Sequence, residues 1–160
     1  MARPVRWVWT LSGVFIIGLF CLVILNGCGT SRAAGIQADG RLAPCPSSPN
    51  CVCSQDPDSA HQIAAITYTG ERSDAHRRLL AAIATIPRSE IVNDSTVNQG
   101  TYLHATATTL IMRYTDDLEF IIDDANKRIE VRSLSRIGYS DLGVNRRRVE
   151  ALREAFGKAQ

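Results

Sequence analysis

The sequence lacks a strong charge of either sign. Its 160 residues include 18 Lys and Arg and 16 Asp and Glu, which gives a formal net charge of +2 at pH 7. So small a surplus does not steer a protein to nucleic acid, and we expect no nucleic-acid partner. The charge is uneven, however, because residues 126–160 hold nine basic and four acidic side chains. This basic C-terminal part is suited to anionic headgroups or phosphate, or is simply a solvated helix face.

The sequence also lacks a complete catalytic set at a local spacing. Hydrolysis requires a nucleophile, a base and an orienting group in contact, and the spacing brings no such set together. The carboxylates of the Asp-Asp-x-Glu stretch at 116–119 also divide between the two faces of a strand. We therefore expect a non-catalytic protein without a cofactor, with a hydrolase-type enzyme as the alternative. The candidate residues of that enzyme are Asp116, Asp117, Glu119, Ser140, Asp141, Cys53, His61 and His104.

One long apolar run is present, at the N-terminus, and it predicts export. Arg3 and Arg6 precede an apolar stretch over residues 7–25, and a basic region followed by such a run is typical of a secretory signal. The Leu-Asn-Gly-Cys sequence that ends at Cys28 is similar to a bacterial lipobox, in which Cys28 becomes the lipidated first residue, although Asn26 is unusual there. A run of about 19 residues also spans a bilayer, so an uncleaved signal anchor is the alternative.

Both versions predict a membrane-anchored protein of the bacterial cell envelope, because the positive flank stays in the cytoplasm and the rest is exported to the periplasmic side. Acylation of Cys28 would exceed the two-signal threshold for stable anchoring, and Gly29 after the cysteine permits sorting to an outer membrane. We expect a signal peptide with lipobox, or an anchor, over residues 1–28, a flexible tether over 29–41 and a single domain over 42–160.

Three cysteines of the domain predict a disulfide and one odd thiol. Cys45 and Cys51 bracket a Pro-Ser-Ser-Pro-Asn turn that brings them within bridging distance, and exported proteins form such bonds. Cys51 and Cys53 are too close for an easy bond, which leaves Cys53 unpaired. Two alternatives are a zinc site that includes His61 and a nucleophilic Cys53 with His61 or His104 as base. The cysteines lack the Cys-x2-Cys spacing usual for zinc, so we expect no metal.

Hydrophobic patterns predict an α+β domain. We expect strands over 62–69, 89–94, 101–109 and 110–114, a helix over 74–86 capped by Ser73, and a last helix capped by Asn145. No clear break separates 101–109 from 110–114, and with these two counted as one strand and the hairpin described next, the element order is β-α-β-β-β-β-α. The expected fold is a mostly antiparallel sheet with both helices packed on one face, and a helix-grip shape is the alternative. The buried stripe of the last helix is Val149, Leu152, Ala155 and Phe156.

Residues 117–123 and 128–132 predict a β-hairpin with one register. Apolar residues then face apolar ones, acids face bases, and a slip of one residue destroys both matches. The same register turns Ser133 and Ser135 toward the core, where their hydroxyls need partners. The predicted pairs are Asp123 with Arg128, Ile122 with Ile129, Phe120 with Val131 and Glu119 with Arg132.

The connection at residues 132–148, from this hairpin to the last helix, is the candidate binding site. It is almost entirely polar, small or charged, and Gly138 and Gly143 let it bend. Arginine side chains and the N–H groups of a helix N-terminus suit phosphate or carboxylate. The alternative is a structural network in which Glu119, Asp117 and Asp141 neutralise the arginines. The candidate ligand-binding residues are Arg132, Ser133, Ser135, Arg136, Ser140, Asp141, Asn145 and Arg148.

Three stretches resemble a known family. They are Cys-Pro-Ser-Ser-Pro-Asn-Cys-Val-x-Ser at 45–54, Asp-Asp-Leu-Glu-Phe at 116–120, and Arg-Ser-x-Ser-Arg-x-Gly-Tyr-Ser-Asp-Leu-Gly-Val-Asn-Arg at 132–146. Over about residues 42–156 the chain resembles the domain of unknown function family 1499. Cys53 stands where the family usually has serine, so no family role carries over to that thiol. The resemblance implies an envelope or plastid-related protein and no particular chemistry.

These observations favour an exported, lipid-anchored accessory or binding domain without catalytic activity. We expect it to bind a small anionic ligand or an envelope partner at the connection over residues 132–148. A purely structural envelope protein is the remaining alternative.

Overall fold

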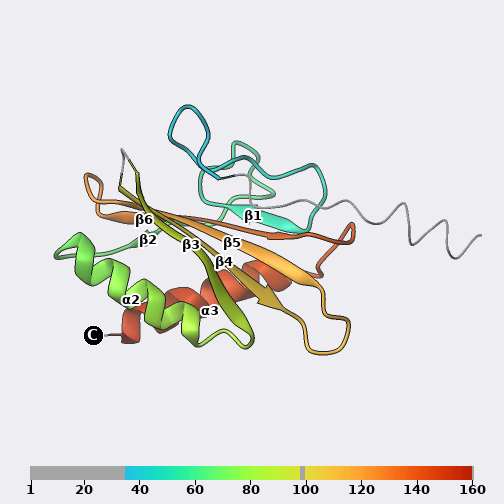
Figure 1. Cartoon of the computed structure of the whole chain (residues 1–160). Helices are drawn as coiled ribbons and strands as arrows, with labels where there is room; N and C mark the ends of the chain where they lie inside the picture. Colours follow the sequence, from blue (N-terminus) through green and yellow to red (C-terminus); the bar gives the residue numbers. More distant parts are fainter. Residues whose placement is uncertain (1–34, 98–99, 160) are drawn as a thin grey trace, which may run out of the picture. The chain divides into compact units, whose positions relative to one another are not determined.

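A computed structural model describes residues 35–97 and 100–159, which form two helices and a six-stranded sheet (Figure 1). The expected α+β class is confirmed. The signal segment, Cys28 and residues 29–34 lie outside the described residues. No helix in the described ranges is long and apolar enough to cross a membrane. The elements are β1 Cys51–Cys53, β2 Ile66–Thr67, α2 Arg72–Ala84, β3 Ser89–Val97, β4 Gly100–Thr108, β5 Thr115–Asp123, β6 Arg128–Ser135 and α3 Val144–Lys158.

The sheet is antiparallel, with strand order β1-β6-β5-β4-β3, and β2 pairs with the far end of β6. The predicted hairpin register is confirmed, including Glu119 opposite Arg132 and Ile122 opposite Ile129. Strand β1 was not predicted, because three residues show no alternation that a sequence pattern can reveal. It aligns Val52 with Ser133 of β6, so the cysteine-rich segment lies directly beside the strand that leads into the connection.

Both helices cover one face of the sheet, as predicted (Figure 1). Leu79 and Ile83 of α2 pack with Phe120 of β5 and Leu152 of α3 in one buried cluster. Fully burying such a side chain stabilises the fold by about 1.5–3 kcal/mol. The opposite face is covered by the segment around β1, where Leu42, Cys53, Tyr102 and Ile121 form a second cluster. Strands β4, β5 and β6 are therefore buried on both faces, and the charged residues of β5 and β6 must find partners inside the fold.

Both predicted helix caps are wrong. Helix α2 begins at Arg72 with Glu71 at the N-cap, not Ser73, and ends at Ala84. Helix α3 begins at Val144 with Gly143 at the N-cap, at φ +76°. Asn145 lies inside the first turn and is fully buried, because another side chain accepts the N–H groups that an N-cap residue would take.

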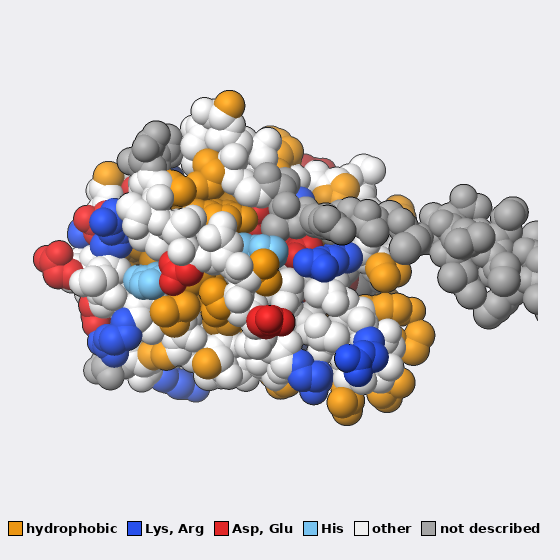
Figure 2. Space-filling model, in the orientation of Figure 1, with side chains coloured by type: hydrophobic (Ala, Val, Ile, Leu, Met, Phe, Trp, Pro, Cys, Tyr) orange, Lys and Arg blue, Asp and Glu red, His pale blue; other side chains and the backbone are white. Residues whose placement is uncertain are grey.

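Residues 110–114 form a turn, not the predicted strand. Thr109 closes the turn, because its N–H donates to the Tyr114 carbonyl at 2.9 Å and its Oγ1 accepts the Tyr114 N–H at 2.9 Å. Ile111, at the tip, is 85% exposed, so its apolar character does not reflect burial. Figure 2 shows hydrophobic side chains gathered at the same end of the domain, at the lower right of the view. The predicted strand over 62–69 is likewise only β2, with a single bridge from Gln62 to Cys53.

The ordered domain begins earlier than the tether predicted over residues 29–41 allows. The N–H of Gly35 donates to Glu119 Oε1 at 2.8 Å, and Ile36 bridges to Leu42. Arg41 Nη2 donates to the Gln55 carbonyl at 2.7 Å. Residues 35–41 therefore pack against the rest of the domain, and the Gly35 N–H is a donor to the buried Glu119 carboxylate.

Strand β3 forms one edge of the sheet and pairs with β4 alone. Most of its nine residues are exposed, including Val92 at 55%. The register shifts between Ile91 and Asn93, which marks a bulge that interrupts the hydrogen-bond ladder.

Candidate functional site at the β6–α3 connection

The connection between β6 and α3 is held in a bent shape by Asp141. Its Oδ1 accepts the Gly143 N–H at 2.9 Å and its Oδ2 accepts the Asn145 N–H at 2.7 Å. A carboxylate at this position also suits the positive end of the α3 dipole. Asp141 therefore caps α3, and no arginine is its partner among the described residues. Ser140 lies on the exposed side of the same turn, where its Oγ accepts the Leu142 N–H at 3.3 Å.

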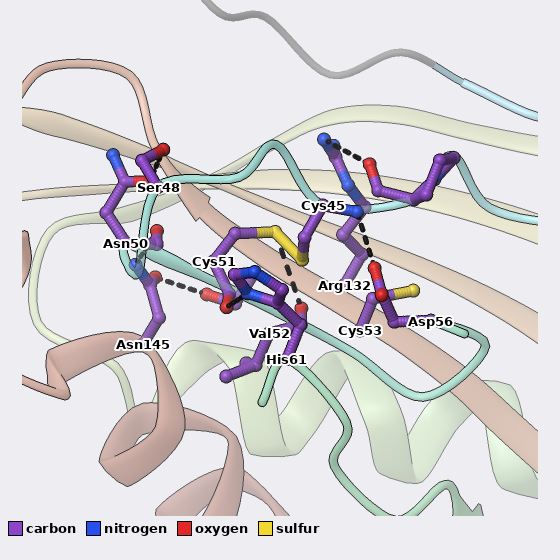
Figure 3. Close-up of a disulfide and its surroundings, with 12 residues drawn as sticks. Cys45, Ser48, Asn50, Cys51, Val52, Cys53, Asp56, His61, Arg132 and Asn145 are labelled. Atoms are coloured by element: carbon purple, nitrogen blue, oxygen red, sulfur yellow. Dashed lines mark hydrogen bonds between the residues drawn. A yellow bond between two sulfur atoms is a disulfide. The ribbon is translucent and has the colours of Figure 1, made fainter. Parts of the chain in front are cut away.

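Asn145 joins α3 to β6 and to the cysteine-rich segment (Figure 3). Its Oδ1 accepts Ser133 Oγ and Arg148 Nη1, each at 2.6 Å. Its Nδ2 donates to the Asn50 carbonyl and to Ser135 Oγ, each at 2.9 Å. Two acceptor and two donor bonds saturate a buried amide. The two core-facing serines thus find the partners that their position requires.

Asn50 makes the complementary set of bonds from the cysteine-rich segment. Its Nδ2 donates to the carbonyls of Gly138 at 2.6 Å and Ser135 at 3.2 Å. Cys45 and Cys51 form the predicted disulfide, with Cα atoms 5.6 Å apart (Figure 3). Asn50 therefore holds the disulfide loop to β6 through its side-chain amide and to α3 through its carbonyl.

Three arginines of the candidate site each pair with a carboxylate of β5. Arg132 Nη1 lies 2.7 Å from Glu119 Oε2. Arg136 grips Asp117 with two bonds, from Nε at 2.9 Å and from Nη2 at 2.7 Å. Arg148 reaches across from α3 to Asp116, which faces the helices. Two of the pairs join β6 and the connection to β5, and the third joins α3 to β5, so together they fix the position of the connection.

Residues of β4 complete the surroundings of these carboxylates. His104 Nε2 lies 2.8 Å from Asp117 Oδ1, and the Tyr102 hydroxyl donates to Glu119 Oε1 at 2.8 Å. Burial alone would raise the pKa of Asp117, but the hydrogen bonds from Arg136 and His104 outweigh it and lower that pKa. Burial, and then the neighbouring Glu119 charge, raise the pKa of the Tyr102 hydroxyl. The bonds from Arg136 and His104 thus favour the ionised form of Asp117.

This geometry leaves little cationic surface for an anion. The side chains of Arg132 and Arg148 are only 5% and 11% exposed, and that of Arg136 is 31% exposed. The predicted structural network accounts for these arginines, with Asp116 in the role expected of Asp141. Arg132 Nε is the one buried guanidinium nitrogen of the site without a hydrogen-bond partner in the described ranges.

The candidate nucleophile Cys53 is poorly placed for chemistry. Its side chain is fully buried, and burial raises the pKa of its thiol to about 11. The reactive thiolate is therefore scarce at neutral pH. His61 Nδ1 lies 3.0 Å from the Cys51 carbonyl, which only accepts, so this nitrogen carries the proton. His104 is held by Asp117, and no histidine contact with the thiol is present in the described part of the chain.

The carboxylate alternative fares no better. Asp116 faces the helices, whereas Asp117 and Glu119 face the opposite side, and all three are held by arginines. Across residues 35–97 and 100–159, no three His, Cys, Asp or Glu side chains lie close enough to hold a metal ion.

The surface around the connection is strongly apolar. Of the ten large hydrophobic residues that are exposed in the described ranges, eight lie at this end, and we call them the apolar end. These eight residues lie on two segments, residues 110–114 and residues 137–144, which we call the two turns. A cavity of about 270 Å³ is lined by residues of both turns, including Tyr114 and Leu142. The two turns are therefore neighbours. The apolar end consists of Leu110, Ile111, Met112, Tyr114, Ile137, Tyr139, Leu142 and Val144.

A second cavity, of about 280 Å³, lies beside the disulfide loop and is lined by His61, Tyr139 and Arg146 among others. The guanidinium of Arg146 already donates to the carbonyls of Gln62 and Ala60, at 2.8 and 3.3 Å. The Arg146 guanidinium thus holds in place the loop that contains Ala60 and Gln62.

The sequence pattern of the family described as protein of unknown function (DUF1499) matches residues 41–156. The chain belongs to this family. The matched range contains the six strands, the whole of α2, all but the last two residues of α3, and the Asn50–Asn145 network. No match to the chain was found among curated proteins or among solved structures.

Two residues that organise the DUF1499 domain were not predicted from the sequence. Asn50 was interpreted only as part of a turn between cysteines, and Asp116 was not assigned to Arg148. For Asp116 a signal did exist, because its alternation with Leu118 and Phe120 places it on the helix side of β5. For Asn50 the sequence offers none, since its partners outside its own turn lie 85 to 95 residues away.

Proposed function

We propose that the chain is an exported, membrane-anchored, non-catalytic binding domain of the bacterial cell envelope, and that the apolar end is its binding surface. One observation carries the proposal: eight of the ten exposed large hydrophobic residues of the described chain lie on two adjacent turns. Contiguous exposed apolar surface on a soluble domain marks an interaction site. The N-terminal signal and lipobox predicted from the sequence supply the membrane anchor.

The polar network beneath the apolar end supports this role. Asn145, Asn50 and the Arg148–Asp116 pair fix the base of the connection from the inside. A surface whose backbone is already ordered loses less conformational entropy when it binds. The buried arginines therefore serve as the rigid support of the binding surface, and direct anion binding through them is not part of the proposal.

In-cell crosslinking tests the proposal. A photoreactive residue at position 142 of the full-length chain is expected to crosslink to a protein or lipid, because Leu142 is 83% exposed on the apolar end. The same probe at Glu154, on the exposed side of α3, is the control and is expected to give no product.

A second substitution decides whether the crosslink reports this surface. Ile111→Ser on the neighbouring turn is expected to reduce the crosslink from position 142, whereas Val92→Ser, an equally apolar change on β3, leaves it intact. Equal crosslinking from positions 142 and 154, or none from either, contradicts the binding role and favours a purely structural protein.

The anchor is tested separately by intact mass. The mature protein is expected to carry acyl mass on Cys28, and Cys28→Ser is expected to remain as unacylated precursor. A wild-type product of full length without acyl mass would replace the lipoprotein with a signal anchor.

A further inference from the structure

We infer that the apolar end docks on the surface of the same lipid bilayer that holds the N-terminal anchor. The inference rests on the proposed function, since it assigns a bilayer as the partner of that surface. Three observations lead to it: the chemistry of the two turns, the way their side chains project, and the length of chain before the described domain.

The composition of the apolar end matches a membrane interface. Tyr114 and Tyr139 combine an apolar ring with a polar hydroxyl, as do the aromatic residues found at the boundary of a bilayer. Arg113 lies exposed within the first turn, and the exposed Arg147 holds the second turn through the Leu142 carbonyl at 2.9 Å. Basic side chains beside apolar ones favour an anionic lipid surface.

Negative charge is nearly absent from this end. Residues 109–114 contain no acid and residues 136–144 contain only Asp141. Both oxygens of that carboxylate accept N–H groups at the start of α3. The neighbouring Asp116 is buried and paired with Arg148. No unpaired carboxylate in these two turns therefore opposes an anionic bilayer.

Several side chains of the apolar end lie at turn tips and are almost fully exposed. Leu110, Ile111 and Leu142 are 71%, 85% and 83% exposed. A protein partner is best matched by side chains that form a packed, partly buried patch. Apolar side chains that are almost fully exposed are suited to insertion among lipid headgroups, which adapt to each side chain. The projection thus favours a bilayer over a protein.

The chain before the domain is long enough for both contacts. Gly35 is held at Glu119 on β5, and the apolar end starts four residues away, beyond Thr115. Four strand residues span about 13 Å, whereas the seven residues from Cys28 to Gly35 reach at most about 24 Å. An anchor at Cys28 and the apolar end can therefore meet the same membrane surface.

Tryptophan fluorescence in proteoliposomes tests the inference on the full-length chain. The chain has two tryptophans, Trp7 and Trp9, so Trp7→Phe and Trp9→Phe remove the background. Leu142→Trp then places one reporter on the apolar end, and Glu154→Trp is the control. Val144 and Glu154 are ten residues apart, or about 15 Å along α3.

Vesicles of phosphatidylcholine and phosphatidylglycerol with brominated acyl chains are the quencher. We expect about a twofold loss of emission from Leu142→Trp, because residues at the interface reach the upper acyl region. The control at position 154 is expected to keep its emission. Ile111→Trp reports the other turn and is expected to behave as Leu142→Trp does, so that a folding defect in one variant leaves the test intact.

The arginine contribution is tested in the same vesicles. Quenching of Leu142→Trp is expected to increase as the phosphatidylglycerol content of the vesicles rises. Adding Arg113→Gln and Arg147→Gln is expected to remove that increase. Unquenched emission at both position 111 and position 142 overturns the inference. If those positions crosslink to a protein in cells at the same time, the proposed function stands and only its bilayer partner is wrong.

Discussion

At the scale of single residues, Asn145 contributes most to the geometry of the candidate site. Asn145→Ala removes two donor and two acceptor bonds inside a fully buried network. We expect it to lower the free energy of unfolding by about 3 kcal/mol, since several buried groups lose their partners together. Urea denaturation followed by circular dichroism measures the change.

Asn126→Ala provides the matched control for that substitution. Asn126 is exposed and bonds only to Asp123 in its own turn, so its removal is expected to alter stability by less than about 0.5 kcal/mol. Similar losses in the two variants would show that the Asn145 network does not hold the connection in place.

Cys53 carries a prediction about reactivity. Its buried thiol has a pKa raised to about 11, which keeps it protonated and shielded at neutral pH. We expect no alkylation of Cys53 by iodoacetamide in the folded protein at pH 8, and complete alkylation in urea, as read from the mass of the peptide. Fast labelling of the folded protein would revive the nucleophile alternative.

At the scale of elements, the disulfide closes the loop that leads into β1. Cys45 and Cys51 are six residues apart, and closing so short a loop stabilises the fold by about 2 kcal/mol in the chain-entropy model. Replacing both cysteines by serine is expected to lower the denaturation midpoint accordingly. Reductant should then shift the wild-type curve and leave that of the double variant unchanged.

Gly100 carries a second prediction for the sheet. At φ +146° its position leaves no room for a side chain, because a Cβ atom would collide with the Ile122 carbonyl of β5. Gly100→Ala is expected to cost at least about 2 kcal/mol. Gly157→Ala is the control with the opposite sign, since it meets open space near the end of α3 and replaces a poor helix former.

The elements also show what the sequence could predict. The β5–β6 register followed from matched pairs such as Glu119 with Arg132. A shift of one residue would place apolar residues opposite charged ones, so the alternation along the two strands allows only one register. The start of α3 did not follow, since Asp141 took the capping role for which Asn145 was equally suited. The strand predicted over residues 110–114 was wrong, because exposed apolar residues give the same sequence signal as a buried strand.

The candidate site was predictable only in part, for a related reason. The connection, its arginines and its serines were identified from composition, and the disulfide from cysteine spacing. The links from Asn50 to Asn145 and from Asp116 to Arg148 join segments that only the fold brings together. The apolar end was missed because its two turns are separated in the sequence by the whole of β5 and β6.

At the scale of the whole molecule, the buried Asp117 carboxylate predicts sensitivity to acid. The pKa of Asp117 is lower in the folded protein than its usual value of 3.8, so its ionised form stabilises the fold above that value. The contribution is lost as the pH falls from about 3.8 toward the lower pKa of the folded state.

Asp117→Asn isolates this contribution. The variant is expected to be less stable than the wild type by about 2 kcal/mol at pH 7, and the difference is expected to shrink below pH 3.8. Thermal unfolding across pH 2–7 measures both curves. A difference that stays constant to pH 2 would show that the Arg136 and His104 bonds do not favour the ionised carboxylate.

The bulge in β3 hinders the pairing of this sheet edge with another copy of the chain. An open strand edge invites pairing with other strands, above all where copies are concentrated, as the proposed membrane anchor would concentrate them. A neighbouring strand that tried to extend the sheet would lose its alignment between Ile91 and Asn93, where the ladder changes step. Crowded copies can thus remain individually dispersed along that margin.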